Sequence, residues 1–152
     1  MRLLIAVDAD SAHAVSAAAG ELFPNAECVV FNAVPFLSTV VPGTIVTGAA
    51  MVIPSEDVLL AAEKHSDVAL AAATKALPVA AVESASVVGD PGPAVCDEAV
   101  AIGADVIVLG RSERGWLSRL FVPSVADYVV KHAPCAVLVV RHDEPSDERP
   151  SV

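Results

Sequence analysis

Short apolar runs that alternate with longer segments of helical periodicity are the feature that most constrains how this chain folds. The runs are rich in Val, Ile and Leu and too short for helices, which is typical of strands buried on both faces. Strands separated by helices need crossover connections, and right-handed crossovers produce a parallel sheet covered by helices on both sides. The expected strands are Leu3–Val7, Cys28–Ala33, Val79–Val88, Ala104–Leu109 and Ala136–Val140.

The segments between these strands carry residues that begin and end helices. Each opens near a Ser or Asp, whose side chain can accept hydrogen bonds from the first free amides of a helix. Each stops next to a Pro or Gly, which helices rarely continue through. The expected helices are bounded by Ser11 and Pro24, Ser55 and Leu77, Asp90 and Gly103, and Ser124 and Pro134, with Ser11, Asp90 and Ser124 as N-caps.

These elements predict a single-domain α/β fold with an open five-stranded parallel sheet and helices on both faces. A chain of 152 residues, 55% of them hydrophobic, can bury the core of one such domain without disulfides or structural metal. We expect residues 1–142 to form the domain and residues 143–152 to be a flexible acidic tail.

The charge balance narrows the choice of partners. With nine Lys and Arg against nineteen Asp and Glu, the net charge is −10, which argues against nucleic acid or an anionic membrane surface as partner. Three arginines nevertheless crowd into one short stretch, at Arg111, Arg114 and Arg119.

Cysteine usage and the first residues indicate the compartment. The three cysteines are far apart in apolar surroundings, so we expect buried free thiols in a reducing compartment. The acids Asp8 and Asp10 come too early for a secretory signal sequence. Both observations predict a cytoplasmic protein. The cysteines are Cys28, Cys96 and Cys135.

The segment Cys28–Ser55 contains no charged residue and is long enough to cross a bilayer. Proline and glycine interrupt it and no basic residue flanks it, so we do not expect a membrane span. Its second part, Pro35–Pro54, is a long uncharged loop, which suggests a lid or a hydrophobic surface for a protein partner.

Ligands of open parallel sheets bind at the carboxyl ends of the strands. Here these ends are followed by the loops after Asp8, Ala33 and Leu109. The third loop, Gly110–Ser124, combines arginines with a glycine turn and a helix N-terminus, a combination suited to an anion such as phosphate. It is not a P-loop, and no GxGxxG follows the first strand. Alternatively, the arginines only solubilise the loop and pair with nearby acids.

The chain resembles the universal stress protein family along nearly its whole length. The resemblance is carried by the opening strand that ends at Asp8, by the stretches 88–91 and 103–110, and most strongly by residues 124–140. It implies an adenine nucleotide alpha hydrolase-like fold with strand order 3-2-1-4-5. It also implies a homodimer, formed by antiparallel pairing of the final strands, here Ala136–Arg141.

ATP-binding members of this family carry Gly, two residues, Gly, nine residues, then Gly-Ser/Thr. The corresponding positions here are Gly110, Glu113, Pro123 and Ser124, so the first glycine and the serine match while the second and third glycines do not. A carboxylate and a proline ring would stand where backbone should approach phosphate, which predicts a weakened or lost ATP site.

The resemblance also implies which residues would form a nucleotide site. Asp8 matches the acid that contacts the adenosine half, and Ala33 stands where backbone contacts adenine. Alternatively, Asp8 only ends its strand. The full candidate set is Asp8, Ala33, Leu109, Gly110, Arg111, Arg114, Ser124 and Val125, with ATP as the one possible cofactor and no metal.

No catalytic constellation accompanies these residues. GxSxG and HExxH patterns are absent, and the four histidines are scattered, with His132 expected at a helix end. The sequence therefore predicts a stress-response protein that acts as a dimeric binding module without turnover. One alternative is a regulatory switch that binds ATP or another adenine nucleotide. Another is slow ATP hydrolysis or nucleotidyl chemistry, which the missing base and metal ligands disfavour.

Overall fold

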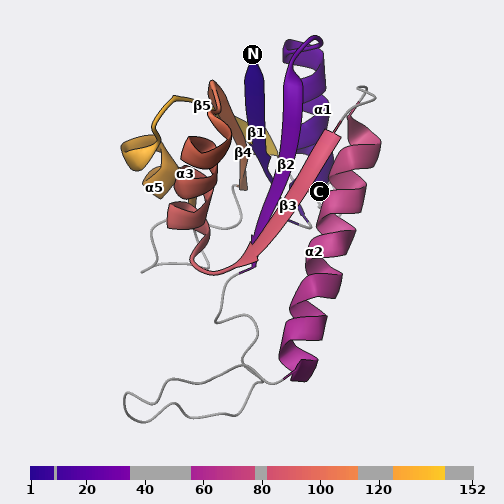
Figure 1. Ribbon diagram of the computed structural model, residues 1–152. Coiled ribbons are helices and arrows are strands. Elements are labelled where there is room, and N and C mark those ends of the chain that lie inside the picture. Colours follow the sequence, from indigo (N-terminus) through magenta and orange to yellow (C-terminus); the bar gives the residue numbers. More distant parts are fainter. Residues whose placement is uncertain (9, 35–55, 78–81, 113–124, 143–152) are drawn as a thin grey trace, which may run out of the picture.

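The computed structural model of the chain describes residues 1–8, 10–34, 56–77, 82–112 and 125–142. Strands and helices alternate along these residues, as the apolar runs predict (Figure 1). The strands are β1 (Arg2–Ala6), β2 (Glu27–Val34), β3 (Val82–Val88), β4 (Val106–Ser112) and β5 (Ala136–His142). The helices are α1 (Ala12–Leu22), α2 (Glu56–Ala76), α3 (Pro91–Ile102) and α5 (Val125–His132).

The strands form one parallel sheet in the order β3-β2-β1-β4-β5. This order and the α/β class confirm the expected fold. β1 is central, with β2 on one side and β4 on the other, and β3 and β5 are the two edges. The topology reverses direction at β1 and β4, so a ligand site is expected at their carboxyl ends.

Helices cover both faces of the sheet, α1 and α2 on one side and α3 and α5 on the other (Figure 1). Side chains alternate along each strand between two cores. The first core holds Leu3, Ile5, Val15, Val30 and Val108, and the second holds Leu4, Phe31, Val95, Ile107 and Val129. Nearly all these side chains are aliphatic, as a chain with only 4% aromatic residues requires.

The strand ends differ from the expected ones where polar residues join a ladder or where a helix cap takes residues away. β4 and β5 run past their apolar stretches because Arg111 pairs with Arg141 across the ladder. β4 begins at Val106 and not at Ala104, because Gly103 and Ala104 complete α3. The Ala104 amide donates to the Ala99 carbonyl at 2.9 Å, and Gly103 has φ 64°, the left-handed cap that was expected.

Ser11 occupies the N-cap position of α1 as expected, but its hydroxyl makes no capping bond into the helix. The capping side chain is that of Asp8, three residues earlier. Its Oδ1 accepts a hydrogen bond from the Ser11 amide at 2.7 Å, and its carbonyl oxygen accepts one from the Ala12 amide at 3.0 Å. Asp90 stands in front of α3 as expected, although its side chain makes no capping bond. The expected cap at Ser124 lies outside the described residues.

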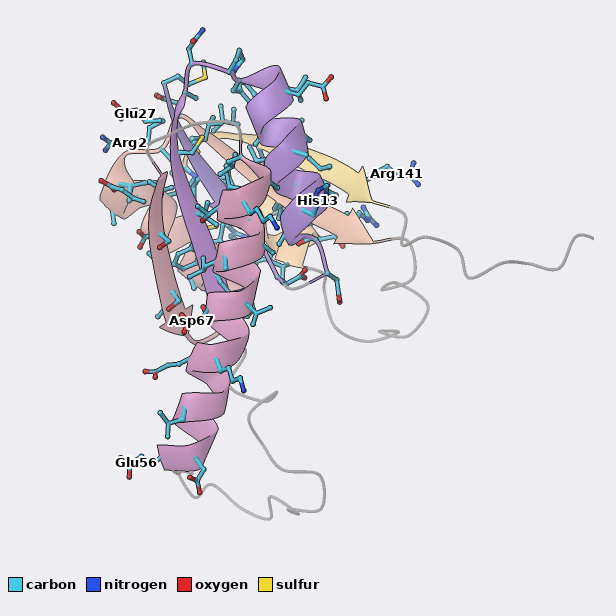
Figure 2. All side chains as sticks on the ribbon, turned by 90° about the vertical axis from the view of Figure 1, so that its right-hand side faces the viewer. Arg2, His13, Glu27, Glu56, Asp67 and Arg141 are labelled. Atoms are coloured by element: carbon cyan, nitrogen blue, oxygen red, sulfur yellow. The ribbon has the colours of Figure 1, made fainter. Side chains whose placement is uncertain are left out.

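Arg2 links the amino ends of β1 and β2 to the segment that follows α3 through hydrogen bonds and an ion pair (Figure 2). Its guanidinium donates to the Ile102 carbonyl at 2.8 Å and pairs with Glu27 at 3.0 Å. Its backbone amide donates to Asp105 at 2.7 Å. These bonds link β1 to β2 and to the end of α3, at the edge of the sheet opposite the expected ligand site.

The cysteines are free thiols, as expected, and two of them, Cys28 and Cys96, are buried. Cys135 is only half-buried, because it precedes the exposed edge strand β5. Across the described part of the chain, no helix combines the length and the hydropathy that a bilayer crossing needs. The expected loop Pro35–Pro54 and the expected tail 143–152 lie outside the described residues.

Candidate functional site at the carboxyl edge of the sheet

Residues from three adjacent strands meet at the carboxyl edge of the sheet. β1 pairs with β2 and with β4, and continuing this register by two residues past Ala6 brings Asp8 level with Ala33 and Arg111. Gly110 precedes Arg111 within β4. The sheet thus gathers one carboxylate and one guanidinium at the switch point, from positions about a hundred residues apart in the sequence.

The Asp8 carboxylate is held by the turn that begins α1. Oδ1 accepts hydrogen bonds from the amides of Ser11 at 2.7 Å and Asp10 at 3.1 Å. In return, the Asp8 amide donates to the Ser11 hydroxyl at 3.2 Å, so the two residues form a reciprocal capping box. The side chain is exposed at the same time. Asp8 therefore lies just beyond the end of β1, begins the turn into α1 and presents an anchored, exposed carboxylate at this edge of the sheet.

Arg111 is engaged by an acid from the facing helix. Its Nη1 lies 3.8 Å from Oδ1 of Asp127, in the first turn of α5, and both side chains are about half exposed, at 51% and 49%. The pair contributes little to stability because solvent screens it. Its effect on an anion is larger, because Asp127 offsets both the Arg111 charge and the partial positive charge of the helix N-terminus.

The remaining candidates lie at the same edge but differ in what they can offer. Leu109 is 3% exposed and packs in the core beneath α3 and α5, so only its backbone can meet a ligand. Val125 and Ala33 are half-buried against the same core. Arg114 and Ser124, together with the motif positions Glu113 and Pro123, lie outside the described residues.

His132 closes α5, as expected. Its Nδ1 lies 2.9 Å from the Tyr128 carbonyl oxygen, and its ring stacks on the Tyr128 ring with centroids 4.1 Å apart. The helix therefore ends in a stacked pair at its carboxyl terminus, away from Asp8 at the other end of the strands. Within the described ranges, no three His, Cys, Asp or Glu side chains come together as metal ligands would.

Two residues of this edge were missed by the sequence reasoning. Asn32 is 6% exposed, and its Nδ2 donates to the Val7 carbonyl at 2.7 Å. Asp127 is the second, because the sequence did not identify it as the acid that pairs with Arg111. Asn32 did leave a signal, because an amide inside an otherwise apolar strand must find a hydrogen bond when it is buried.

An open parallel sheet of order 3-2-1-4-5 with helices on both faces defines a doubly wound α/β protein, a class whose ligands bind at the carboxyl edge of the sheet. Residues 1–141 match the sequence profile of the universal stress protein family, so the chain belongs to that family.

Individual relatives are similar over smaller parts. Universal stress protein Sll1388 of Synechocystis is 44% identical over 55 residues, which cover 36% of this chain and 36% of that protein. The chain thus spans about a third of the length of the curated relatives it matches.

Solved structures are similar over nearly the whole chain. The universal stress protein UspA from Lactobacillus plantarum has a TM-score of 0.66 at 23% identity, covering 93% of this chain and 97% of that one. The universal stress protein from Archaeoglobus fulgidus in complex with dAMP has a TM-score of 0.56 at 20% identity, covering 92% of this chain and 97% of that one. At these identities the similarity confirms the fold.

Proposed function

We propose that this protein binds adenine nucleotides through their adenosine half, gains little affinity from their phosphates, and serves the stress response as a dimeric, non-catalytic binding module in the cytoplasm. The nucleotide would lie across the carboxyl ends of β1, β2 and β4. ATP would bind as one adenine nucleotide among several and would not be turned over.

The geometry of Asp8 supports the proposal that the site binds the adenosine half of the nucleotide. A carboxylate oxygen anchored by two backbone amides cannot swing freely, and the exposed carboxylate can accept hydrogen bonds from ribose hydroxyls or from the amine of adenine. The backbone of Ala33 lies level with it on the neighbouring strand. The dAMP complex of the Archaeoglobus fulgidus relative is consistent with this proposal.

The proposal that the phosphates add little affinity is supported chiefly by one observation, the 3.8 Å distance between Arg111 Nη1 and Asp127 Oδ1. A triphosphate approaching the start of α5 would meet an acid in the first turn, next to an arginine whose charge that acid partly offsets. The sequence adds Glu113 and Pro123 at two positions where the family pattern has glycine. Repulsion and two lost backbone contacts together would cost on the order of a hundredfold in affinity.

Homodimerisation through β5 completes the proposal. β5 is an edge strand with Val and Leu side chains that are only half-buried, and an unpaired edge of this kind accepts a second strand. Antiparallel pairing of two copies would cover it. The uncharged segment 35–54 remains the proposed surface for a protein partner.

A regulatory switch that binds ATP tightly is the second candidate. It shares the anchored Asp8 carboxylate with the first candidate and differs from it in the phosphate half. In this case Arg111 would leave Asp127 and, with Arg114, bind phosphate.

Thermal unfolding with added ligand separates the two candidates. A ligand raises the melting temperature in proportion to ln(1 + [L]/Kd). With millimolar adenosine, AMP or magnesium-ATP, the proposed module shows similar shifts for all three ligands, whereas the switch shows a shift several degrees larger for ATP. No shift with any of them would contradict nucleotide binding altogether, and steady phosphate release from ATP would contradict the non-catalytic role.

A further inference from the structure

We propose that Asn32 is a positioning residue of the nucleotide site: its buried amide holds the peptide bond between Val7 and Asp8 and so orients the Asp8 carboxylate. The proposal rests on the proposed function, in which Asp8 meets the adenosine half. Asn32 itself would not touch the nucleotide.

The first observation is where the Asn32 amide reaches. Asn32 lies near the carboxyl end of β2, is 6% exposed, and donates from Nδ2 to the Val7 carbonyl oxygen at 2.7 Å. That carbonyl belongs to the peptide group whose nitrogen is the amide of Asp8. Asn32 therefore acts on the bond that immediately precedes the site acid.

The second observation is that this peptide group is held on both sides. Asn32 holds its oxygen, and the Ser11 hydroxyl accepts a hydrogen bond from its N–H at 3.2 Å. One residue earlier, the Val7 amide donates to the Phe31 carbonyl at 2.9 Å, which extends the ladder between β1 and β2 beyond the end of β1. A peptide plane fixed at its oxygen and at its nitrogen cannot rotate, so the direction in which Asp8 leaves the strand is fixed as well.

The third observation is that only one of the two polar atoms of the Asn32 side chain, Nδ2, has a hydrogen-bond partner among the described residues. Its Oδ1 is buried and has no partner among the described residues. An unpartnered buried acceptor is unfavourable, and an apolar residue of similar shape would avoid that loss. The bond that Asn32 does make is the one that reaches the site, which favours a role in positioning over a role in stability.

Ser16 and Ser66 show that an unpartnered polar atom alone does not indicate such a role. Their hydroxyls are also buried without a partner. However, both lie within helices, where a hydroxyl can turn to the carbonyl one turn earlier, and neither is hydrogen bonded to a residue of the site. Ser66 therefore provides a matched control on the same side of the sheet.

The test uses Asn32→Leu and Val30→Ala. Leu has the same number of side-chain heavy atoms as Asn, fills the volume and removes both the donor and the unpartnered oxygen. Val30 lies two residues earlier on the same face of β2 and is 0% exposed, so Val30→Ala weakens the core without touching the Val7–Asp8 peptide. The control variant Ser66→Ala removes a buried, unpartnered hydroxyl from α2, the helix layer that covers this face of β2.

We expect opposite results for the two principal variants. Asn32→Leu keeps a melting temperature close to that of the unchanged protein but binds AMP about tenfold more weakly, as expected for the loss of one hydrogen bond that orients the site. Val30→Ala melts at a lower temperature and binds AMP as before, and Ser66→Ala changes neither. A purely structural Asn32 would instead give Asn32→Leu an unchanged AMP affinity, and that result would overturn the proposal.

A second measurement needs no nucleotide. Amide hydrogen exchange of ligand-free protein reports directly on the clamp, and we expect faster exchange at the Asp8 amide in Asn32→Leu than in Val30→Ala, each relative to the rate at the amide of Ile5. Equal rates in the two variants would contradict positioning even if the unchanged protein bound no AMP. Failure of the unchanged protein to bind AMP, with the exchange result as expected, would refute the proposed function and leave the clamp established.

Discussion

Asp8 shares its carboxylate between the helix that follows it and the open edge of the sheet. One oxygen is anchored by the amides of Ser11 and Asp10, and the side chain is nevertheless exposed. Capping and the proposed ligand binding can therefore be separated by substitution, because capping needs an acceptor oxygen whereas the proposed site would also use the negative charge.

Asp8→Asn and Asp8→Ala should divide these two roles. Asn retains an acceptor for the cap, so Asp8→Asn keeps its stability, while its AMP affinity falls because a neutral amide accepts hydrogen bonds more weakly than a carboxylate. Asp8→Ala loses the same affinity and, in addition, about 1 kcal/mol of stability. Urea unfolding and AMP titration measure the two effects. If Asp8→Asn bound AMP as well as the unchanged protein does, the carboxylate would have no part in binding.

The buried thiols give a pH dependence. Burial raises the pKa of the Cys28 thiol above its ordinary value of 9.0, so the folded state favours the neutral thiol. Above that pH the unfolded chain loses its proton first, and stability falls as the pH rises. In urea unfolding between about pH 8 and pH 10, Cys28→Val should show a shallower decline than the unchanged protein. Parallel declines would mean that Cys28 ionises equally easily in both states.

Residue-scale roles were the hardest to predict from the sequence. Asp8 and Ser11 are three residues apart, and both are residue types that cap helices. Only the backbone conformation decides that the Asp8 carboxylate accepts from the first turn of the helix, while the Ser11 hydroxyl accepts from the Asp8 amide. The role of Asn32 was hidden for a different reason. Its partner is the carbonyl of Val7, and pairing across strands that are distant in the sequence does not follow from local pattern.

At the scale of elements, α3 and α5 approach closely at a glycine. A Cβ on Gly92 would lie 2.8 Å from Cγ and Cδ1 of Tyr128. The Tyr128 ring cannot move away easily, since it is stacked on the His132 ring at 4.1 Å. The absence of a side chain at this position lets the two helices pack on the same face of the sheet.

Gly92→Ala should therefore destabilise the protein by about 1–3 kcal/mol, the usual loss for overpacking a core contact. Gly89→Ala is the matched control, because a Cβ at Gly89 meets nothing within 4 Å. Thermal unfolding should show a drop of several degrees for the first variant and little change for the second. Equal stability of both variants would mean that α3 and α5 can separate freely.

The helices and strands themselves were well predicted, because apolar runs and the residues that begin and end helices are features of the local sequence. All five strands and four helices of the described residues fall where these patterns indicate. The errors lie at ends, where β4 and β5 continue through polar residues such as Arg111 and Arg141 that pair only because their strands are neighbours. Apolar pattern carries no information about such pairing.

At the scale of the whole molecule, the two edge strands of the sheet, β3 and β5, differ in the side chains that they expose. β5 carries half-buried Val and Leu, whereas β3 carries exposed Glu83, Ser84 and Ser86 beside one exposed apolar residue, Val87, so we expect a second copy to pair with β5. The charged pair at Val137 and Val139 that a dimer test would first suggest is unsuitable, because both side chains also pack against the core beneath α3 and α5.

Light scattering and amide exchange test this dimer without substitutions. The expected mass is twice 15.5 kDa, and the outward-facing amides of β5 should exchange more slowly than those of β3, which serves as the internal control. Dilution to the monomer should remove the difference. A mass of one chain, or equal exchange at both edges under dimer conditions, would contradict pairing through β5.

The order of the sheet and the gathering of Asp8, Ala33 and Arg111 at one edge were predictable from strand alternation and family resemblance together. The opposing effect of Asp127 was not, because it depends on how α5 faces β4. This contact bears on the central claim, that the adenosine half of the site is retained while the phosphate half is weak.

Calorimetric titration of the Glu113→Gly/Pro123→Gly double variant tests that claim most directly, with adenosine, AMP and magnesium-ATP as ligands. In the unchanged protein the account predicts AMP and ATP affinities within several-fold of each other. In the double variant it predicts a gain of up to about a hundredfold for ATP and none for adenosine. An unchanged protein that already prefers ATP to AMP by a hundredfold, or a double variant with no gain for ATP, would contradict it.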